Sequence, residues 1–219
     1  MRLSVVVPAL NAEGVLGACL ARLGGADEIV VVDGGSTDRT VAIAEAAGAR
    51  VVLAPRGRGV QLRAGAEAAR WDWFLFLHAD TLLGDGWREA AQAHAAAHPG
   101  KAAACRFRLA DPAWQARWIE RGVRLRSRLL ALPYGDQGLL VSRALYEAVG
   151  GYRPLPLMED VDLVRRIGRR RLRLLDVEAA TSAARWRRDG WVRRSGRNLF
   201  CLACWRVGMA PERVARLYG

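Results

Sequence analysis

Four apolar runs alternate with helical patterns near the start of the sequence, and this alternation constrains the fold more than any other feature. The runs are Leu3–Val7, Glu28–Val32, Val51–Leu53 and Trp73–Leu77. The segments between them have the pattern of helices of about ten residues. Apolar runs separated by such helices are typical of parallel strands that are buried on both faces. We therefore expect an α/β fold with a mostly parallel central sheet and helices on both faces.

The second half of the sequence is less regular. We expect strands at 102–109, 139–141 and 172–175, an Arg-rich helix at 112–130 and a loop at 133–138. Further helices are expected to begin near Ser142 and Glu159. No internal repeat and no linker divides the chain, and a length of 219 residues fits one domain with a modest extension.

Polar clusters follow several of the predicted strands and loops. In parallel sheets, ligands bind at the carboxyl ends of the strands. They are Asp33–Asp38, His78–Asp80 and Glu159–Asp162. Each has a plain structural explanation, because turns and first helical turns favour such residues as caps. The functional alternatives are an anion site at the first cluster, a metal completed by a diphosphate at the second, and a general base at the third.

In their order along the chain, these clusters resemble the inverting family-2 glycosyltransferases. The resemblance is strongest to a short, single-domain bacterial group with a His-Ala-Asp-Thr motif in place of Asp-x-Asp. It rests on Val5–Glu13, Val31–Asp38, Phe76–Thr81, Gly135–Gly138 and Met158–Leu163, and it covers roughly residues 3–185. Members of this family have the GT-A fold of nucleotide-diphospho-sugar transferases. The resemblance therefore implies that fold and a glycosyltransferase activity.

The resemblance also implies which residues lie beside a nucleotide-sugar donor. They are Pro8, Ala9, Asn11, Glu13, Asp33, Gly34, Arg58, Gln61, His78, Ala79 and Asp80. Asp33 matches the first acidic position of the family's Val-Asp-Asp-Gly-Ser motif, and His78 replaces a carboxylate near the ribose. Gly34 stands where relatives carry a second Asp that can contact a uracil ring. The base of the donor therefore stays open.

The same resemblance implies the chemistry of the site. Asp80 takes the place of the metal-binding Asp of the family's motif, so we expect it to hold Mg²⁺ or Mn²⁺. Glu159 and Asp160 are the candidate catalytic carboxylates, with Asp160 as the general base, and Gln137 and Gly138 are expected on the acceptor side. An acceptor hydroxyl would lose its proton to Asp160 and attack the anomeric carbon with inversion. The metal would stabilise the leaving nucleoside diphosphate.

Within this interpretation, residues 1–185 form the catalytic domain, with a nucleotide-binding half at 1–100 and an acceptor half at 101–185. Residues 186–219 form a basic, aromatic and helical tail. A short apolar run at 198–205 is flanked by arginines, with two tryptophans upstream. This pattern suits a membrane surface or a partner, and equally packing against the domain. The sequence leaves these alternatives open.

Positive charge is concentrated in the second half of the chain. Residues 1–116 hold 12 Lys and Arg against 12 Asp and Glu, whereas residues 117–219 hold 22 against 10 and carry the whole net charge of +12. Such an asymmetry indicates an anionic partner. No nucleic-acid-binding motif accompanies the charge, so we do not expect nucleic acid as a partner. A lipid-linked acceptor would fit both the charge and the tail.

Other features of the sequence limit where the protein is expected in the cell and which other functions it could have. No signal peptide is recognised, and no apolar window reaches about 18 residues, so we expect a cytoplasmic protein, at the inner face of the cell membrane if the tail binds lipid. Four cysteines in this length do not indicate a disulfide framework.

One alternative function is a nucleotidyltransferase on a similar sheet, although the glycine-rich loop of such enzymes is missing after the first run. The other is a non-catalytic basic module that binds membrane or nucleic acid.

Overall fold

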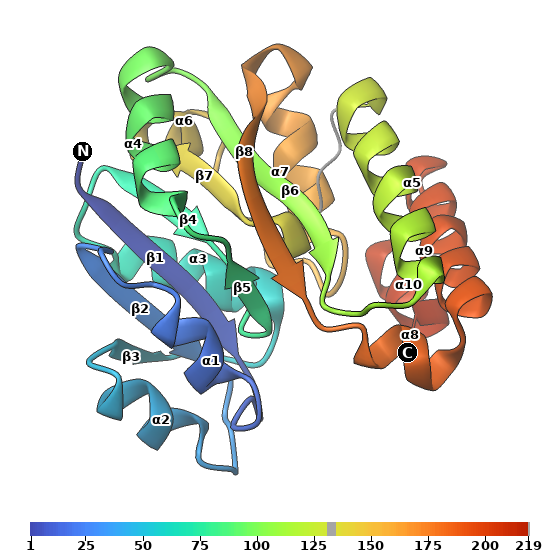
Figure 1. Cartoon of the computed structure of the whole chain (residues 1–219), viewed down its shortest axis with the longest axis horizontal. Helices are drawn as coiled ribbons and strands as arrows, with labels where there is room; N and C mark the ends of the chain where they lie inside the picture. The colour runs from blue at the N-terminus through green and yellow to red at the C-terminus, as the bar shows by residue number, and fades with distance from the viewer. Residues whose placement is uncertain (131–134, 219) are drawn as a thin grey trace.

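The computed structural model describes residues 1–130 and 135–218, and within these ranges one eight-stranded sheet forms the centre of the molecule (Figure 1). The strand order is β3-β2-β1-β4-β7-β6-β8-β5. The strands are β1 (Leu3–Ala9), β2 (Glu28–Asp33), β3 (Arg50–Leu53), β4 (Trp73–Phe76), β5 (Thr81–Leu83), β6 (Ala102–Leu109), β7 (Leu139–Ser142) and β8 (Leu172–Thr181). Strands β3, β2, β1 and β4 are parallel, and β7 runs antiparallel to both of its neighbours. The carboxyl ends of β1, β2 and β4 therefore meet at one edge.

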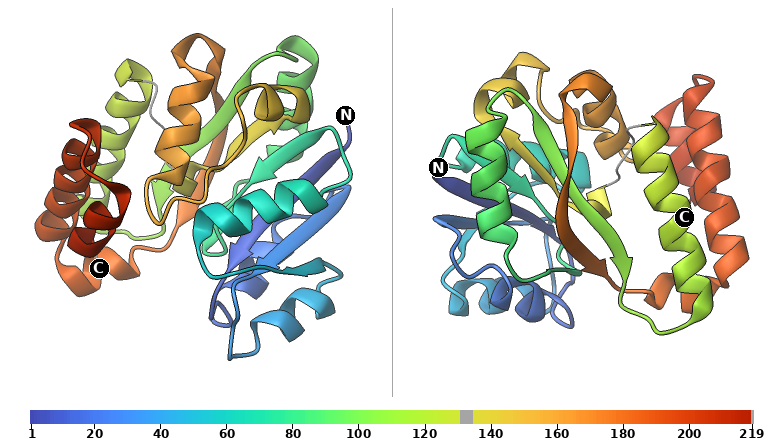
Figure 2. Two further views of the ribbon diagram at one scale, coloured as in Figure 1. Left: turned by 180° about the vertical axis from the view of Figure 1, so that it is seen from behind. Right: turned by 45° about the horizontal axis from the view of Figure 1, so that its top comes forward.

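Helices cover both faces of the sheet (Figure 2). Their bounds are α1 (Leu16–Ala21), α2 (Thr40–Ala46), α3 (Arg58–Ala68), α4 (Trp87–Ala97), α5 (Trp114–Leu130), α6 (Arg143–Ala148), α7 (Glu159–Ile167), α8 (Ala184–Asp189), α9 (Trp191–Arg206) and α10 (Pro211–Tyr218). Helices α1, α2 and α4 contribute to the core on one face, and α3, α6 and α7 to the core on the other. The α/β class, with its central sheet and helices on both faces, is confirmed.

Strand β1 shows why two cores form. Its successive side chains point to opposite faces, so Val5 and Val7 pack with α1 and α4, whereas Val6 packs with α3. All three valines are fully buried. Helix α3 lies very close to the sheet at Gly65, where a Cβ atom would stand 2.3 Å from Val6 Cγ1. A glycine is required at this position, and the close approach sets the height of α3 over the strand ends.

Two strands differ from the prediction. Strand β8 continues to Thr181, beyond the predicted end at Leu175, because the polar residues Asp176 and Glu178 lie on a partly exposed face while Val177 and Ala179 are buried. Strand β5 was not predicted, since three residues are too few for a periodic pattern. Its pairing with β8, with Thr81 opposite Thr181, exists only in the tertiary structure. The loop expected at 133–138 falls partly outside the described residues, and 135–137 form a short 3-10 turn.

The last three helices pack against the rest of the molecule. Cys201 and Val214 are fully buried and belong to the same core as α3, α6 and α7. The opposite face of α9 exposes Leu199 and Phe200. In Figures 1 and 2, α8, α9 and α10 lie beside α5, at the end of β6 and β8. Within the described ranges, no helix is both long and apolar enough to cross a bilayer.

Candidate active site

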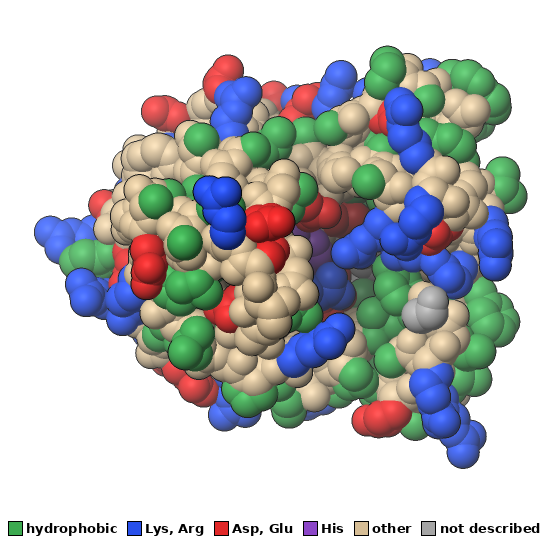
Figure 3. All heavy atoms as spheres, turned by 90° about the horizontal axis from the view of Figure 1, so that it is seen from below, with side chains coloured by type: hydrophobic (Ala, Val, Ile, Leu, Met, Phe, Trp, Pro, Cys, Tyr) green, Lys and Arg blue, Asp and Glu red, His purple; other side chains and the backbone are tan. Residues whose placement is uncertain are grey.

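Three adjoining cavities form a cleft, of which two lie at the carboxyl ends of the strands and the third lies between α5 and α9. We call them the strand-end cavity, the central cavity and the apolar groove. The strand-end and central cavities share Arg58, His78, Asp80 and Arg185 in their walls, so the two adjoin. Figure 3 shows this region from below as a hollow between two parts of the molecule, with basic side chains at its edge.

The strand-end cavity gathers most of the residues that the sequence places beside a nucleotide. Eight of the eleven line it, namely Pro8, Ala9, Asn11, Arg58, Gln61, His78, Ala79 and Asp80. They come from the ends of β1 and β4 and from the first turn of α3. Gln61 also has a structural task, because its side-chain amide donates to the carbonyl oxygens of Ala9 and Val32, both at 2.8 Å. This pair of bonds fixes the ends of β1 and β2 to each other.

The remaining three predicted residues, Glu13, Asp33 and Gly34, lie outside the walls of the strand-end cavity. Glu13 accepts a hydrogen bond from the backbone of Arg39 at 3.1 Å. Asp33 Oδ2 accepts from the backbone N–H groups of Gly35 and Ser36, both at 2.9 Å, and so shapes the turn after β2. These side chains shape the loops that border the cleft.

The Gln61 amide leaves little space for a side chain at position 34, where the resemblance to the family leads one to expect an acidic residue. A Cβ atom at position 34 would stand only 3.0–3.1 Å from the Gln61 amide group. That amide is held by its two backbone bonds and has little room to move. An aspartate at position 34 would therefore require this amide to shift slightly against its two bonds.

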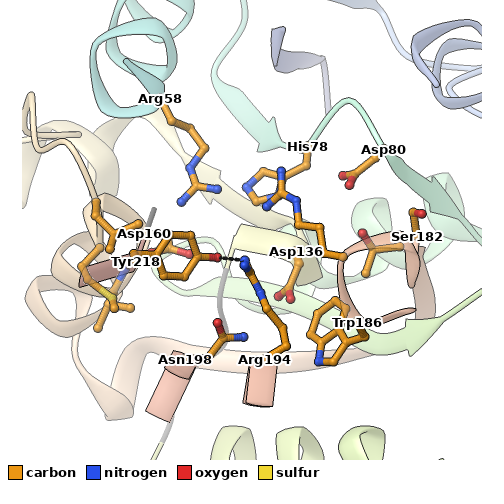
Figure 4. A pocket seen from close by; sticks show the side chains of 15 residues that line it. Arg58, His78, Asp80, Asp136, Asp160, Ser182, Trp186, Arg194, Asn198 and Tyr218 are labelled. Carbon is orange, nitrogen blue, oxygen red and sulfur yellow. Dashed lines mark hydrogen bonds between the residues drawn. The ribbon is translucent and has the colours of Figure 1, made fainter. Parts of the chain in front are cut away.

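The central cavity, of about 100 Å³, brings acidic and basic groups together (Figure 4). Arg58, His78 and Asp80 lie on one side of it, and Asp136 and Asp160 reach it from other parts of the chain. Burial, with further contributions from Arg58 and Arg185, holds the pKa of His78 well below its ordinary value. The imidazole is therefore neutral at physiological pH and adds no charge of its own to the cavity.

Glu159 and Asp160 have different surroundings although they are neighbours. The chain turns at Met158, which has a left-handed backbone with φ of 64°. Glu159 is 0% exposed and forms an ion pair with Arg58. Burial raises the pKa of Glu159, and the charge of Arg58 opposes the rise. Asp160 lines the central cavity, and its Oδ1 accepts a hydrogen bond of 2.7 Å from the backbone N–H of Val161.

The residue of the Gly135–Gly138 segment that reaches the cleft is Asp136, which lines both the central cavity and the apolar groove. Gln137 instead is buried, where its amide donates to the Cys105 carbonyl at 2.9 Å and accepts from the Ser127 hydroxyl at 3.1 Å. Gly138 has a positive φ and packs against Leu77. The structure thus does not bring Gln137 or Gly138 into the walls of the three cavities.

Asp136 should make the stability of the fold depend on pH. Burial, together with Asp160 and Asp80, raises its pKa from 3.8 to about 6. A carboxyl group with a raised pKa in the folded state favours folding while protonated, so this contribution is present below about pH 4 and is lost as the pH rises through about 6. One pKa unit corresponds to about 1.4 kcal/mol, so the loss approaches 3 kcal/mol.

The measurement compares urea unfolding of the wild type and of Asp136→Asn in EDTA from pH 4 to 7.5. The free energy of unfolding of the wild type should fall relative to that of the variant as the pH rises. A constant difference across this range would show that Asp136 does not titrate there.

The C-terminal helices supply residues that the sequence analysis did not identify. Arg185 lines the central cavity, together with Arg194, Asn198 and Tyr218, which Figure 4 labels. The buried Arg194 donates hydrogen bonds to the Tyr218 hydroxyl and to Asp189 Oδ2. These residues belong to no motif. The only signal for them was the basic, aromatic character of the tail.

Comparison with known proteins gives a family and several relatives. A family model described as glycosyl transferase family 2 matches residues 4–152. A PGL/p-HBAD biosynthesis glycosyltransferase of Mycobacterium bovis is 37% identical over 91 residues, which cover 36% of each chain. A glucosyl-3-phosphoglycerate synthase of Mycolicibacterium paratuberculosis is 36% identical over 94 residues, covering 36% of this chain and 29% of the relative. The matched segment spans about a third of the length of these curated relatives.

Solved structures share the fold. S. aureus TarS 1-349 in complex with UDP-GlcNAc has a TM-score of 0.65 at 20% identity, covering 83% of this chain and 58% of that chain. Glucosyl-3-phosphoglycerate synthase from Mycobacterium tuberculosis, in complex with Mn²⁺ and UDP-glucose, has a TM-score of 0.60 at 21% identity, covering 82% and 71%. The expected GT-A fold is confirmed.

Proposed function

Because the chain belongs to glycosyl transferase family 2, we propose that it transfers a sugar from a nucleotide-diphospho-sugar to an acceptor hydroxyl with inversion at the anomeric carbon. One observation carries the proposal. Residues from four segments far apart in the sequence, represented by Asn11, Arg58, Asp80 and Asp160, line two adjoining cavities.

The strand-end cavity is the proposed site of the nucleotide. It lies at the carboxyl ends of parallel strands, where ligands bind in sheets of this kind. Arg58 and Arg185 stand at its junction with the central cavity, where the charge of a diphosphate would be. The titles of two similar structures name UDP-GlcNAc in one protein and UDP-glucose in the other, which supports a nucleotide-sugar donor here.

The donor set at Asp80 fits a divalent metal that the substrate completes. Within the described residues, no three His, Cys, Asp or Glu side chains gather as a metal cluster. Mg²⁺ is commonly held by one or two carboxylates together with substrate phosphates and water, and Mn²⁺ also prefers such oxygen ligands. Asp80 lies where both cavities meet and would hold the ion. When bound, the ion would neutralise the charge that develops on the leaving diphosphate.

Asp160 is the proposed general base. Its carboxylate lines the central cavity, beyond the junction with the strand-end cavity, so an acceptor hydroxyl in the central cavity could reach it. The bond from the Val161 backbone orients the carboxylate. Glu159 is turned away and neutralised by Arg58, so its proposed role is to hold that arginine in place.

The proposal is tested with purified protein, Mn²⁺ or Mg²⁺ and a panel of nucleotide sugars. We expect one donor to bind and to release its nucleoside diphosphate slowly, with water replacing the acceptor. Release should be faster when the true acceptor is present. If no nucleotide sugar binds and none is turned over with either metal, the proposed function is wrong.

Asp80→Ala tests the metal site. We expect the affinity for a nucleoside diphosphate in Mn²⁺ to fall at least tenfold, to the value that the wild type shows in EDTA, because the only protein carboxylate proposed as a ligand is removed. Titration calorimetry measures both affinities. Asp85→Ala is the matched control, since Asp85 lies in the same region of the chain and its side chain is 98% exposed. A metal-dependent affinity that survives in Asp80→Ala would place the ion elsewhere.

A further inference from the structure

The apolar groove lies between α5 and α9 and has a volume of about 610 Å³. Ile119 and Val123 form its wall on α5, and Leu199 and Leu202 form its wall on α9. Pockets of about 300–1,000 Å³ are the usual size for small organic ligands. The groove therefore has the volume and the lining for an apolar molecule.

The groove adjoins the proposed catalytic centre. Asp136, Trp186 and Asn198 line both the groove and the central cavity, so the two adjoin along a shared wall. Asp160, the proposed base, lies in the central cavity. A molecule in the groove could therefore place one end beside Asp160.

The mouth of the groove exposes large apolar side chains. Trp118 is 63% exposed, Leu125 is 59% exposed and Leu199 is 61% exposed. Soluble proteins rarely leave large apolar patches uncovered unless the patch binds something. A free sugar acceptor, with hydroxyl groups on every side, would not need such walls.

The charge around the groove indicates which kind of molecule it binds. Arg126 lies in its wall, and Arg121 and Arg124 lie on the same helix. The central cavity beyond adds Arg185, whereas its Arg194 is paired with Asp189 and its carboxylates belong to the proposed metal and base sites. Apolar walls flanked by arginines match a hydrocarbon chain with an anionic end.

We propose that the apolar groove holds the hydrocarbon chain of an anionic lipid acceptor, whose hydroxyl-bearing end reaches Asp160. The inference rests on the proposed function, because it names the class of acceptor for that site. The chain would lie between α5 and α9, and the polar end would pass Asp136 into the central cavity. No new chemical step is needed, since the lipid supplies only the attacking hydroxyl.

Gly122 offers a way to block the groove without harming the fold. It lies in the groove wall on α5, and a Cβ atom there would meet nothing within 4 Å. Gly122→Leu therefore fills the groove, and it replaces a poor helix former with a good one. Gly196→Leu is the matched control, because Gly196 lies in α9, has equally open space and is not part of the groove wall.

The experiment measures the fluorescence of dansylamino-undecanoic acid bound to the full chain, and its displacement by dodecyl phosphate. In parallel, calorimetry measures the affinity for a nucleoside diphosphate with Mn²⁺. We expect the wild type and Gly196→Leu to bind the probe alike and Gly122→Leu to bind it at least tenfold more weakly. Nucleoside diphosphate affinity should be equal in all three proteins.

The possible results distinguish a failure of the lipid inference from a failure of the proposed function. Absence of probe binding to the wild type, or equal binding by Gly122→Leu, would overturn the lipid inference while leaving the proposed function intact. Sedimentation that shows a wild-type dimer, converted to monomer by Gly122→Leu, would also overturn it, because a second copy would then cover the groove. Probe binding without any affinity for nucleotides would instead defeat the proposed function.

Discussion

Replacing Asp160 with Asn should reduce kcat by about 10²–10⁴-fold, because removal of a general base typically costs that much. Donor binding should be unchanged, since the base acts only when the acceptor hydroxyl attacks. Asn retains the shape of the side chain and a carbonyl oxygen that can accept the Val161 hydrogen bond. The loss should therefore appear in turnover and not in the dissociation constant of the nucleoside diphosphate.

Steady-state release of nucleoside diphosphate, together with calorimetry, separates these two quantities. Glu159→Gln is the comparison variant, because Glu159 precedes Asp160 directly and faces Arg58 instead of the cavity, so that a smaller loss of turnover is expected through the weakened hold on Arg58. An inactive Glu159→Gln with an active Asp160→Asn would reverse the assignment of the base. Equal, small losses in both would place the base on another residue, of which Asp136 is the nearest candidate in the same cavity.

Replacing Arg58 with Met should destabilise the fold by about 3 kcal/mol, because removing one partner of a buried ion pair leaves the other charge unpaired at a cost of about 3–5 kcal/mol. Glu159 is fully buried, whereas the Arg58 side chain is 34% exposed, so the lower end applies. Burial already raises the pKa of Glu159, and loss of Arg58 should raise it further. The loss of stability in Arg58→Met should therefore be smaller at low pH, where Glu159 is protonated.

Arg63→Met is the matched control on the same helix. Arg63 pairs with Glu67 at 2.9 Å, but the two side chains are 57% and 65% exposed. Exposed pairs of this kind contribute about 0–1 kcal/mol. In urea unfolding, the loss of unfolding free energy should thus be clearly larger for Arg58→Met than for Arg63→Met. Equal, small losses in both would mean that solvent screens the Arg58 pair as well as the exposed one.

The first half of the fold could be predicted because its signals are local. Each strand from β1 to β4 is an apolar run in the sequence, and the polar residues that line the strand-end cavity follow directly after β1 and β4. Once strands are known to be parallel, their carboxyl ends must meet, so Asn11 and Asp80 could be placed near each other before any coordinates were known. The resemblance in the order of the motifs is the source of the roles proposed for these residues.

The second half could not be predicted to the same depth, because its site residues depend on tertiary packing. Arg194 and Tyr218 reach the central cavity only because Cys201 and Val214 anchor α9 and α10 in the core. No spacing in the sequence reports that arrangement. Within the Gly135–Gly138 segment, a pattern could indicate a functional loop, but only the packing of Gln137 shows that Asp136 faces the cavity.

The contact between Gly34 and Gln61 makes the effects of substitutions at these two positions depend on each other. While Gln61 is bonded to both strand ends, a Cβ atom at position 34 would stand only 3.0–3.1 Å from its amide group. A smaller residue at position 61 would open that space and would give up the two bonds. The stability changes of the two single substitutions should therefore not add in the double variant.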